Sequence, residues 1–280
     1  MKLLWLLLLL QPCVWALQPA MKTWPPALAD ASATWDDTKD SGPLGGWAEK
    51  QLQRYFRSKM VEEVGVPDTF DEGFAGIVEL AHVLASKQTD VGASSRRVMT
   101  TMFPDWPPAP GANGPGLLYW FRILFSERFP GFSAKMVASA TRLFAHWLAG
   151  PLEVKDLEGV DVGDGRRQLV KVKRCRFLEE AKCASVCVNA CMLPTQQFFT
   201  EDMGIPCTLT PDYDTLSCEF KFGLKPTIDN DIKAASVACF KACPVNGQYR
   251  SSSLEEIIST DDSSDASCPD LILPRRPSQH

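Results

Sequence analysis

Cysteine is the residue type in this chain whose number and positions point most clearly to chemistry. Nine of the ten cysteines lie at or after Cys175, and none lies between Cys13 and Cys175. A thiolate can bind soft metals such as iron and zinc, and two thiols can form a disulfide. The chain has only three histidines, the last at its end, which excludes a metal centre that needs three or four imidazoles. Any metal chemistry of this sequence therefore depends on its C-terminal cysteines.

Three cysteines recur at four-residue intervals in one segment. Cys183, Cys187 and Cys191 lie within residues 177–192, which have the apolar periodicity of a helix that ends before Pro194. Four residues turn an α-helix by about 400°, so the three thiols are predicted to share one face. A rise of about 1.5 Å per residue places the outer two roughly 12 Å apart, too far for one small metal site.

A second pair of cysteines, Cys239 and Cys243, has the same four-residue spacing and lies near the end of the chain. It belongs to a last predicted helix, residues 232–243, which ends at Pro244. If this pair faces one adjacent pair of the first helix, four sulfurs converge, a set that suits iron–sulfur or zinc coordination. The predicted metal ligands come from five cysteines: Cys183, Cys187, Cys191, Cys239 and Cys243.

The same geometry also suits two disulfides between facing helices. Residues 1–16 have the positive start, apolar run and small-residue cleavage site of a secretory signal peptide, and the secretory compartment is oxidising. The mature chain would keep nine cysteines, an odd number, so at least one would remain outside any intramolecular pair. The spacing therefore leaves a metal and disulfides both open.

Composition predicts five segments along the chain. The signal peptide, residues 1–16, precedes a linker or targeting segment, residues 17–46, rich in Pro, Ala and Asp. Residues 47–150 have helical periodicity, and residues 151–246 hold most of the cysteines. Residues 247–280 are rich in Ser and Asp and are predicted to be a disordered acidic tail.

Local signals predict the elements of the helical region. Gly65 ends a first helix that starts near Trp47, and a capping box at residues 69–72 starts a second, on which His82 is expected at the edge of the core or on the surface. Residues 102–116 are rich in Pro and Gly and are predicted to be a loop. Two aromatic-rich helices are expected next, residues 117–129 and a helix capped by Ser133. Their aromatic side chains suit a helical core, or the lining of a cleft for a long apolar ligand.

The cysteine-bearing region is predicted to contain a short antiparallel sheet. Alternating apolar residues predict strands at residues 169–173, 207–210 and 216–222. Glu179 and Glu180 are expected to stabilise the start of the cysteine helix. The expected fold is α+β and predominantly α-helical, with a helical N-terminal part packed on a small Cys-rich domain. Basic residues of the strand region suit a solvated face or, alternatively, contact with anionic lipid headgroups: Lys171, Lys173, Arg174 and Arg176.

Charge and motifs exclude several classes of function. The formal net charge is −5, which argues against nucleic acid as the main partner. No P-loop, no dinucleotide-binding glycine motif and no H-E-x-x-H or G-x-S-x-G motif is present. The oligomeric state cannot be predicted from these residues.

The sequence around the cysteines from Cys175 to Cys191 resembles that of a known family. The run CRFLEEAKCASVCVNAC at residues 175–191, followed by Pro-Thr-Gln at 194–196, resembles the C-terminal domain of the Dwarf-twenty-seven-type plastid β-carotene isomerases. Supporting matches are Leu-Ser-Cys at 216–218, Phe-Gly at 222–223, the late cysteine pair and residues 144–151. Two departures are Met192, where the family usually has lysine, and Asp212, where it usually has asparagine.

The resemblance implies an iron-dependent carotenoid cis/trans isomerase that interconverts all-trans- and 9-cis-β-carotene. It implies a carotenoid substrate, iron (as a mononuclear centre or an iron–sulfur cluster), and peripheral contact with plastid membranes. With the signal peptide, it implies delivery to a complex plastid through the endoplasmic reticulum. The alternative from another class is a secreted or lumenal binding protein, stapled by disulfides and without catalysis.

Overall fold

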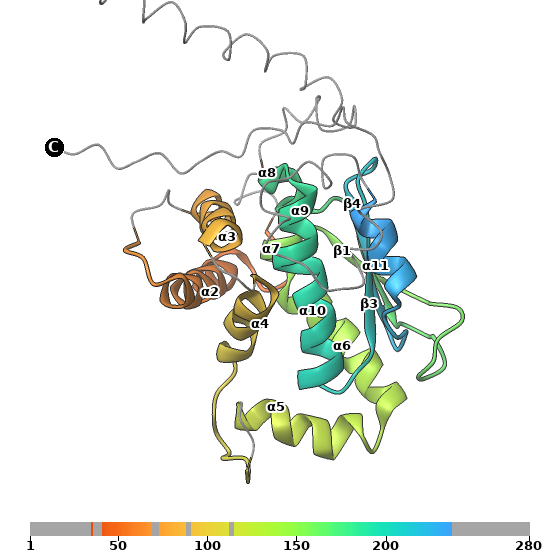
Figure 1. Cartoon of the computed structure of the whole chain (residues 1–280). Helices are drawn as coiled ribbons and strands as arrows, with labels where there is room; N and C mark the ends of the chain where they lie inside the picture. Colours follow the sequence, from red (N-terminus) through yellow and green to blue (C-terminus); the bar gives the residue numbers. More distant parts are fainter. Residues whose placement is uncertain (1–34, 36–40, 69–72, 88–90, 112–114, 237–280) are drawn as a thin grey trace, which may run out of the picture.

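The fold is α+β, as predicted, with many helices and one small antiparallel sheet. It is known from a computed structural model, which describes residues 35, 41–68, 73–87, 91–111 and 115–236. The predicted signal peptide, the capping box at residues 69–72, Cys239, Cys243 and the acidic tail lie outside the described residues. Figure 1 shows the helices stacked beside the sheet, which is seen edge-on.

Three helices form the N-terminal part, in the order α2 (Gly46–Val64), α3 (Phe74–Lys87) and α4 (Val91–Thr101). Gly65 ends α2 in the left-handed conformation, with φ at 66°, as the sequence predicts. The apolar face of α3 is fully buried, and His82 is buried beside it. Helix α4 was not predicted, because its Ser, Arg and Thr residues hide a weak apolar stripe.

An aromatic helix follows the predicted loop and is built from α5 (Gly116–Phe121) and the π-helical η2 (Arg122–Ser126). Helix α6 (Pro130–Phe144) begins three residues before the predicted cap, Ser133. Pro130 starts it instead, because proline fits the first turn, where its missing N–H costs nothing. Ser133 is therefore inside the helix and fully buried. The short α7 (His146–Ala149) ends at Gly150, the residue at which the sequence predicts a helix to end.

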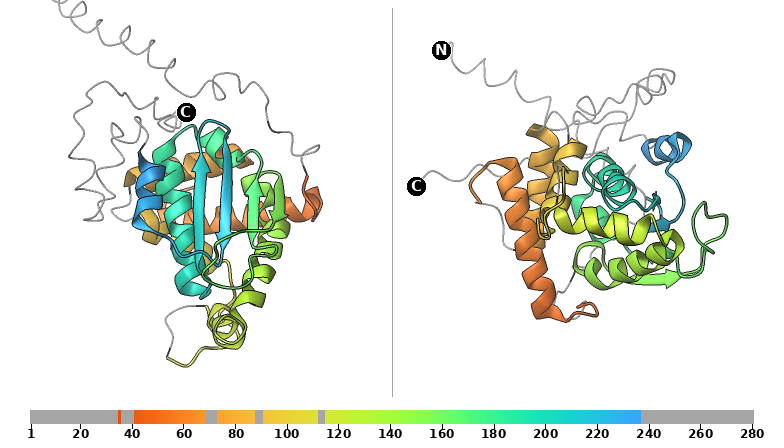
Figure 2. Two further views of the ribbon diagram at one scale, coloured as in Figure 1. Left: turned by 90° about the vertical axis from the view of Figure 1, so that its right-hand side faces the viewer. Right: turned by 90° about the horizontal axis from the view of Figure 1, so that it is seen from below.

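The sheet has four antiparallel strands in the order β1-β2-β4-β3. They are β1 (Leu152–Lys155), β2 (Leu169–Val172), β3 (Cys207–Asp212) and β4 (Ser217–Phe222). Three strands were predicted, whereas β1 is an edge strand that pairs only with β2 and has no clear alternation. Val170, Val172 and Phe222 are fully buried on the inner face. The helices cover this face (Figure 2, left).

The predicted helix over residues 177–192 is interrupted. Helix α8 (Arg176–Ala181) ends at Lys182, a left-handed residue with φ at 48°, and Cys183 is extended. A new helix then runs without a break through α9 (Ala184–Val186), η3 (Cys187–Met192), α10 (Leu193–Gln197) and η4 (Phe198–Asp202). We call this run, residues 184–202, the central helix.

Pro194 does not end the central helix, contrary to prediction. A proline inside an α-helix lacks one N–H and clashes with the carbonyl four residues earlier. The preceding turn is π-helical, and a π-turn is wider than an α-turn, so that it accommodates the ring. The last helix, α11 (Ile228–Ala235), starts four residues before the predicted Ile232, because Thr227 caps it by accepting a hydrogen bond from Asn230 N.

The central helix lies between the sheet and the N-terminal helices (Figures 1 and 2). It contacts α3 and α4 on one side and β3 on the other. The buried apolar side chains form one continuous cluster that reaches from α2 to α11. Among the described residues, no helix is long and apolar enough to cross a membrane.

Candidate functional site

An apolar cavity lies between the N-terminal helices and the central helix. Its walls come from α2, α3, α4, α7, α8 and the η3–α10 part of the central helix. The empty space between these walls, including the part open to solvent, is about 530 Å³. The lining residues are Phe56, Met60, Ala81, Leu84, Ser95, Val98, Met99, Leu148, Phe177, Ala190, Cys191 and Thr195.

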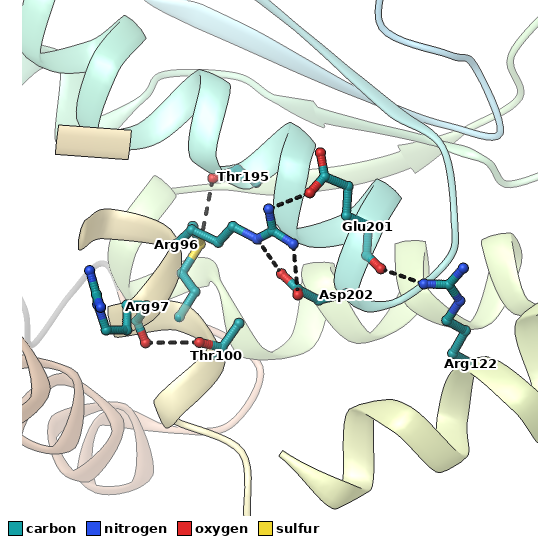
Figure 3. Close-up of polar contacts among 8 residues, drawn as sticks. Arg96, Arg97, Thr100, Arg122, Thr195, Glu201 and Asp202 are labelled. Carbon is teal, nitrogen blue, oxygen red and sulfur yellow. Dashed lines mark hydrogen bonds and ion pairs between the residues drawn. The ribbon is translucent and has the colours of Figure 1, made fainter. Parts of the chain in front are cut away.

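Only three of these lining side chains carry a polar group. They are Ser95 on α4 and Cys191 and Thr195 on the central helix. The Thr195 hydroxyl donates to Met99 Sδ across the cavity wall, at 3.7 Å (Figure 3). No charged side chain is among the described residues that line the cavity. The site therefore suits an uncharged, largely hydrocarbon ligand.

Cys191 is the half-buried thiol of this wall. Burial raises its pKa to about 12, while the hydrogen bond with Thr195 acts in the opposite direction. At neutral pH the group is therefore a neutral, polarisable thiol. The two aromatic side chains of the cavity wall, Phe56 and Phe177, come from α2 and α8. No side chain of α5, η2 or α6, the helices for which the sequence left a ligand cleft open, is among the described lining residues.

Further thiols lie behind the cavity, in the core. Burial raises the pKa of Cys175 to about 11 and the pKa values of Cys187 and Cys218 well above the ordinary value. The mutual influence of these thiols adds to the effect, since Cys191 and Cys175 both raise the pKa of Cys187. Cys175 is held at the edge of the sheet, where its N–H donates to Leu216 O at 2.6 Å.

The structure brings together some of the predicted metal ligands. Cys187 and Cys191 lie on the same π-helical turn, whereas Cys183 precedes the central helix in an extended conformation. The three thiols therefore do not follow one regular helical face, contrary to prediction. Five of the described cysteines, Cys175, Cys187, Cys191, Cys207 and Cys218, are free thiols.

The described residues by themselves do not fit a metal centre. Among them, no three His, Cys, Asp or Glu side chains converge closely enough to hold a metal ion. Desolvation also disfavours the thiolate forms that a metal requires. Cys239 and Cys243, the other two predicted ligands, lie outside the described residues, so the predicted set of five is untested.

An ion-pair cluster fixes the position of α4 against the central helix. Arg96 on α4 donates from Nε and Nη2 to the two carboxylate oxygens of Asp202, at 2.7 and 2.9 Å. It also pairs with Glu201, and Arg122 on η2 donates to Glu201 O at 2.9 Å (Figure 3). Because Ser95 and Met99 of α4 line the cavity, this cluster sets the width of the cavity. Sequence reasoning missed Arg96, since nothing local links it to an acid more than a hundred residues away.

Gln196 holds the other side of the central helix. Its Oε1 accepts from Leu209 N of β3 at 2.8 Å, and its Nε2 donates to Asp231 of α11 at 3.0 Å. The side chain is 3% exposed. The Pro-Thr-Gln segment that carried the family resemblance therefore has three structural roles. Pro194 follows the π-turn, Thr195 lines the cavity and Gln196 joins the helix to the sheet.

The basic residues of the strand region are paired with acids. Lys171 and Lys173 lie 3.4 and 3.5 Å from Glu219 and Glu153, and Arg176 lies 2.7 Å from Glu180. Arg174 pairs with Glu179, which is 4% exposed and also accepts from Trp35 Nε1 at 3.0 Å. Glu179 and Glu180 therefore act as ion-pair partners rather than only as helix-start residues, and each of the four basic side chains has an acidic neighbour.

Comparison with known proteins finds a similarity of the C-terminal part to one family. Residues 147–231 match the family described as Beta-carotene isomerase D27-like, C-terminal. The chain is 40% identical over 105 residues to the chloroplastic beta-carotene isomerase D27 of Medicago truncatula, covering 37% of this chain and 40% of that protein. It is 34% identical over 119 residues to the enzyme of the same name from Arabidopsis thaliana, covering 42% and 44%. The chain thus spans less than half the length of these relatives, and no solved structure matches it.

Proposed function

Because residues 147–231 form a D27-like C-terminal domain, we propose that this protein is a carotenoid isomerase that acts on β-carotene. The observation that carries the proposal is the 40% identity to a β-carotene isomerase. The matched domain contributes Leu148, Phe177, Ala190, Cys191 and Thr195 to the wall of the apolar cavity. The family match and the cavity therefore involve the same residues.

The cavity suits the substrate chemically. A carotene has no group that donates or accepts a strong hydrogen bond, so its binding depends on burial of apolar surface. Aliphatic and aromatic side chains from six elements supply such a surface. Acid–base pairs would contribute little to this reaction, and the described lining residues include none.

The chemical step requires a lower bond order in one double bond of the polyene while it rotates. Among the lining side chains, Cys191 carries the softest and most polarisable atom. We place it in contact with the polyene, opposite Ser95 and Met99 of α4. The finer specificity, all-trans against 9-cis, is proposed from the family resemblance alone.

A substitution that fills the cavity tests the proposal. Ala190 is half-buried on η3 and lines the cavity, so Ala190→Phe should place a ring where the substrate binds. We expect at least a roughly tenfold loss of β-carotene isomerisation in detergent micelles, measured by chromatography of the cis and trans isomers. Ala140→Phe on α6, also half-buried but away from the cavity, is the matched control and should keep most of the activity.

Two results would contradict the assignment. Wild-type protein, purified without oxygen, that leaves all-trans- and 9-cis-β-carotene unchanged would remove the function. Equal activity of Ala190→Phe and wild type, with both folded by circular dichroism, would remove the cavity as the site.

Iron is proposed as the cofactor on the basis of the family resemblance and the cysteine spacing. The ligand set then needs Cys239 and Cys243 in addition to one adjacent pair among Cys183, Cys187 and Cys191.

Metal analysis of anaerobically purified variants tests this set. Cys239→Ser and Cys243→Ser should each lose most of the iron, because serine is a poor ligand for soft metals. Cys268→Ser, in the predicted acidic tail, should retain it. Folded, active wild type without iron would exclude the cofactor, and unchanged iron in both ligand variants would exclude the set.

We further propose a plastid location, reached through the endoplasmic reticulum. The two relatives are named chloroplastic, and residues 1–16 have the pattern of a signal peptide. A fluorescent reporter fused to residues 1–46 should accumulate in the plastid of an alga with a complex plastid. Accumulation in the medium would contradict this route. The alternative of a disulfide-stapled binding protein is not favoured, because five described cysteines are free thiols.

A further inference from the structure

An exposed apolar surface lies at one end of the molecule, away from the cavity. It consists of six side chains from the loop before α5, the α5–η2 helix and the start of α6, and we call it the aromatic end. Their exposed fractions range from 40 to 76%: Trp106, Leu117, Leu124, Phe125, Phe129 and Phe132. Figures 1 and 2 (left) show α5 standing out from the body of the protein.

The opposite side of the same helix is firmly anchored. Leu118 is 3% exposed, and the Ser126 hydroxyl donates to Met203 O at 2.6 Å. Arg122 donates to Glu201 O at 2.9 Å, which ties η2 to the end of the central helix. The aromatic end is therefore the outer face of a helix whose inner face is already packed.

The loop that carries Trp106 is also held in place. Leu117 N donates to Pro104 O, and Trp120 Nε1 donates to Pro108 O, each at 3.3 Å. These two bonds hold the loop that carries Trp106 against the first turn of α5. Soluble proteins rarely expose several large apolar side chains in one region of the chain unless they bind a partner or a membrane.

The charges around the aromatic end differ from those of the whole chain. Residues 115–144 contain four basic residues and one acid, whereas the chain has a net charge of −5. Two of the four are paired with acids, Arg122 with Glu127 at 3.4 Å and Lys135 with Asp164 at 2.8 Å. Arg128 and Arg142 are exposed, and Arg128 is next to Phe129. Tryptophan, phenylalanine and leucine together with arginine are typical of helices that lie in the interface of a bilayer. The combination favours an anionic lipid surface over a second protein.

We propose that the aromatic end docks the protein on the surface of an anionic membrane, with Trp106, Leu124 and Phe129 inserted at the level of the headgroups. The inference rests in part on the proposed function, because a carotene dissolves in the bilayer and not in water. It assigns membrane contact to α5–η2 instead of the strand region, where each basic residue has an acidic neighbour.

Vesicle flotation with the purified full chain tests the docking without any carotene. We expect wild type to bind vesicles of phosphatidylcholine and phosphatidylglycerol in equal parts. Replacing two exposed side chains, in Leu124→Ser/Phe129→Ser, should lower the partition coefficient at least roughly tenfold, because less apolar surface is removed from water. Arg128→Gln should lower it about fivefold on these vesicles and leave binding to pure phosphatidylcholine unchanged.

Two exposed apolar residues elsewhere provide the matched control. Trp47 on α2 is 78% exposed and Ile228 on α11 is 60% exposed. Trp47→Ser/Ile228→Ser removes a similar amount of exposed apolar surface and should bind vesicles like wild type. Isomerisation of β-carotene in detergent micelles should be the same in wild type and in Leu124→Ser/Phe129→Ser, since micelles replace the membrane step.

Two outcomes would overturn the docking proposal. One is equal vesicle binding by wild type and Leu124→Ser/Phe129→Ser, including the case in which neither binds. The other is a wild-type dimer in light scattering that becomes a monomer in this variant, which would make the aromatic end a contact between two copies. A failure of the proposed function would appear separately, as absent isomerisation in micelles with vesicle binding intact.

Discussion

At the scale of the residue, burial decides how each thiol behaves. Cys191 lies on the cavity wall with Thr195 as its neighbour, whereas Cys207 on β3 is completely buried, away from the cavity. Desolvation raises the pKa of both, because a thiolate is poorly solvated in an apolar core. Identical side chains therefore have different access to a ligand although both are protonated at neutral pH.

Cys207 yields a prediction about stability and pH. Burial raises its pKa well above the ordinary 9.0, so the folded protein keeps the proton while the unfolded chain loses it above about pH 9. Ionisation of the Cys207 thiol therefore does not change the free energy of unfolding below about pH 9 and lowers it as the pH rises further. We expect the free energy of unfolding in urea to decline between pH 9 and 11 less steeply in Cys207→Ala than in wild type, by up to about 1.4 kcal/mol per pH unit. Parallel pH profiles would show that Cys207 ionises normally in the fold.

At the scale of the element, a single residue divides the predicted cysteine helix. Lys182 has a left-handed backbone, with φ at 48°, and its N–H donates to Leu178 O to end α8. A left-handed conformation costs a residue with a side chain about 1–2 kcal/mol. The break turns Cys183 away from the helical path that places Cys187 and Cys191 on η3.

Substitution of Lys182 by glycine distinguishes the break from a continuous helix. Lys182→Gly should raise the free energy of unfolding by up to about 1 kcal/mol, because glycine adopts this conformation without strain. In an uninterrupted helix the same change would lower it by about 1 kcal/mol. Lys59→Gly, inside α2, is the control and should be destabilising. Urea denaturation measures both, and a loss of stability in Lys182→Gly would contradict the break.

The link between α4 and the central helix depends on one of two adjacent arginines. Arg96 makes a bidentate contact with Asp202, and both side chains are about one-quarter exposed, at 27 and 23%. Arg97 points to Glu63 and is 60% exposed. The two residues therefore form a natural comparison of a partly buried ion pair with a surface one.

Replacing each arginine by methionine should separate these contributions. Arg96→Met is expected to lose about 1–2 kcal/mol of stability and to weaken β-carotene isomerisation in micelles, since α4 lines the cavity. Arg97→Met should stay within about 0.5 kcal/mol of wild type. Urea denaturation measures the stability of the two variants, and isomerisation in micelles measures their activity. Equal losses of stability and activity in Arg96→Met and Arg97→Met would mean that the Arg96 cluster does not position the cavity wall.

At the scale of the whole molecule, the helical region and the cysteine-bearing region share one core. Phe74 and Leu80 of α3 belong to the same buried cluster as Leu178 of α8 and Phe222 of β4. The cavity itself is lined from both regions. Neither region can bury its apolar surface without the other.

Unfolding should therefore be cooperative across the two regions. We expect one transition in urea, with tryptophan fluorescence and the reactivity of the buried cysteines changing together. Residues 151–246 expressed alone should lack fixed tertiary structure, because the contacts of the central helix with α3 and α4 are lost. A cooperative, independent transition of this fragment would contradict a shared core.

Local signals in the sequence determined much of this fold. Gly65 and Gly150 end helices where the sequence predicts, and alternating residues predicted three of the four strands. The cysteine-rich run from Cys175 and the Pro-Thr-Gln segment were sufficient to indicate the resemblance to the family that residues 147–231 match. Each of these features depends on residues that are a few positions apart in the sequence, so it can be predicted without knowledge of the tertiary structure.

Only the tertiary structure decided where the site is. The cavity joins residues from Phe56 to Thr195, and Arg96 finds its acid on an element 106 residues away in sequence. Helix α6 starts at Pro130 because proline fits its first turn, and Pro194 is accommodated inside the central helix because the preceding turn is π-helical. The apolar periodicity of the sequence shows neither feature. The basic side chains of the strand region have acidic neighbours in the fold, and membrane contact is therefore proposed for α5–η2 instead. Such outcomes arise from packing between distant segments, because burial and charge pairing are properties of the assembled fold rather than of local sequence.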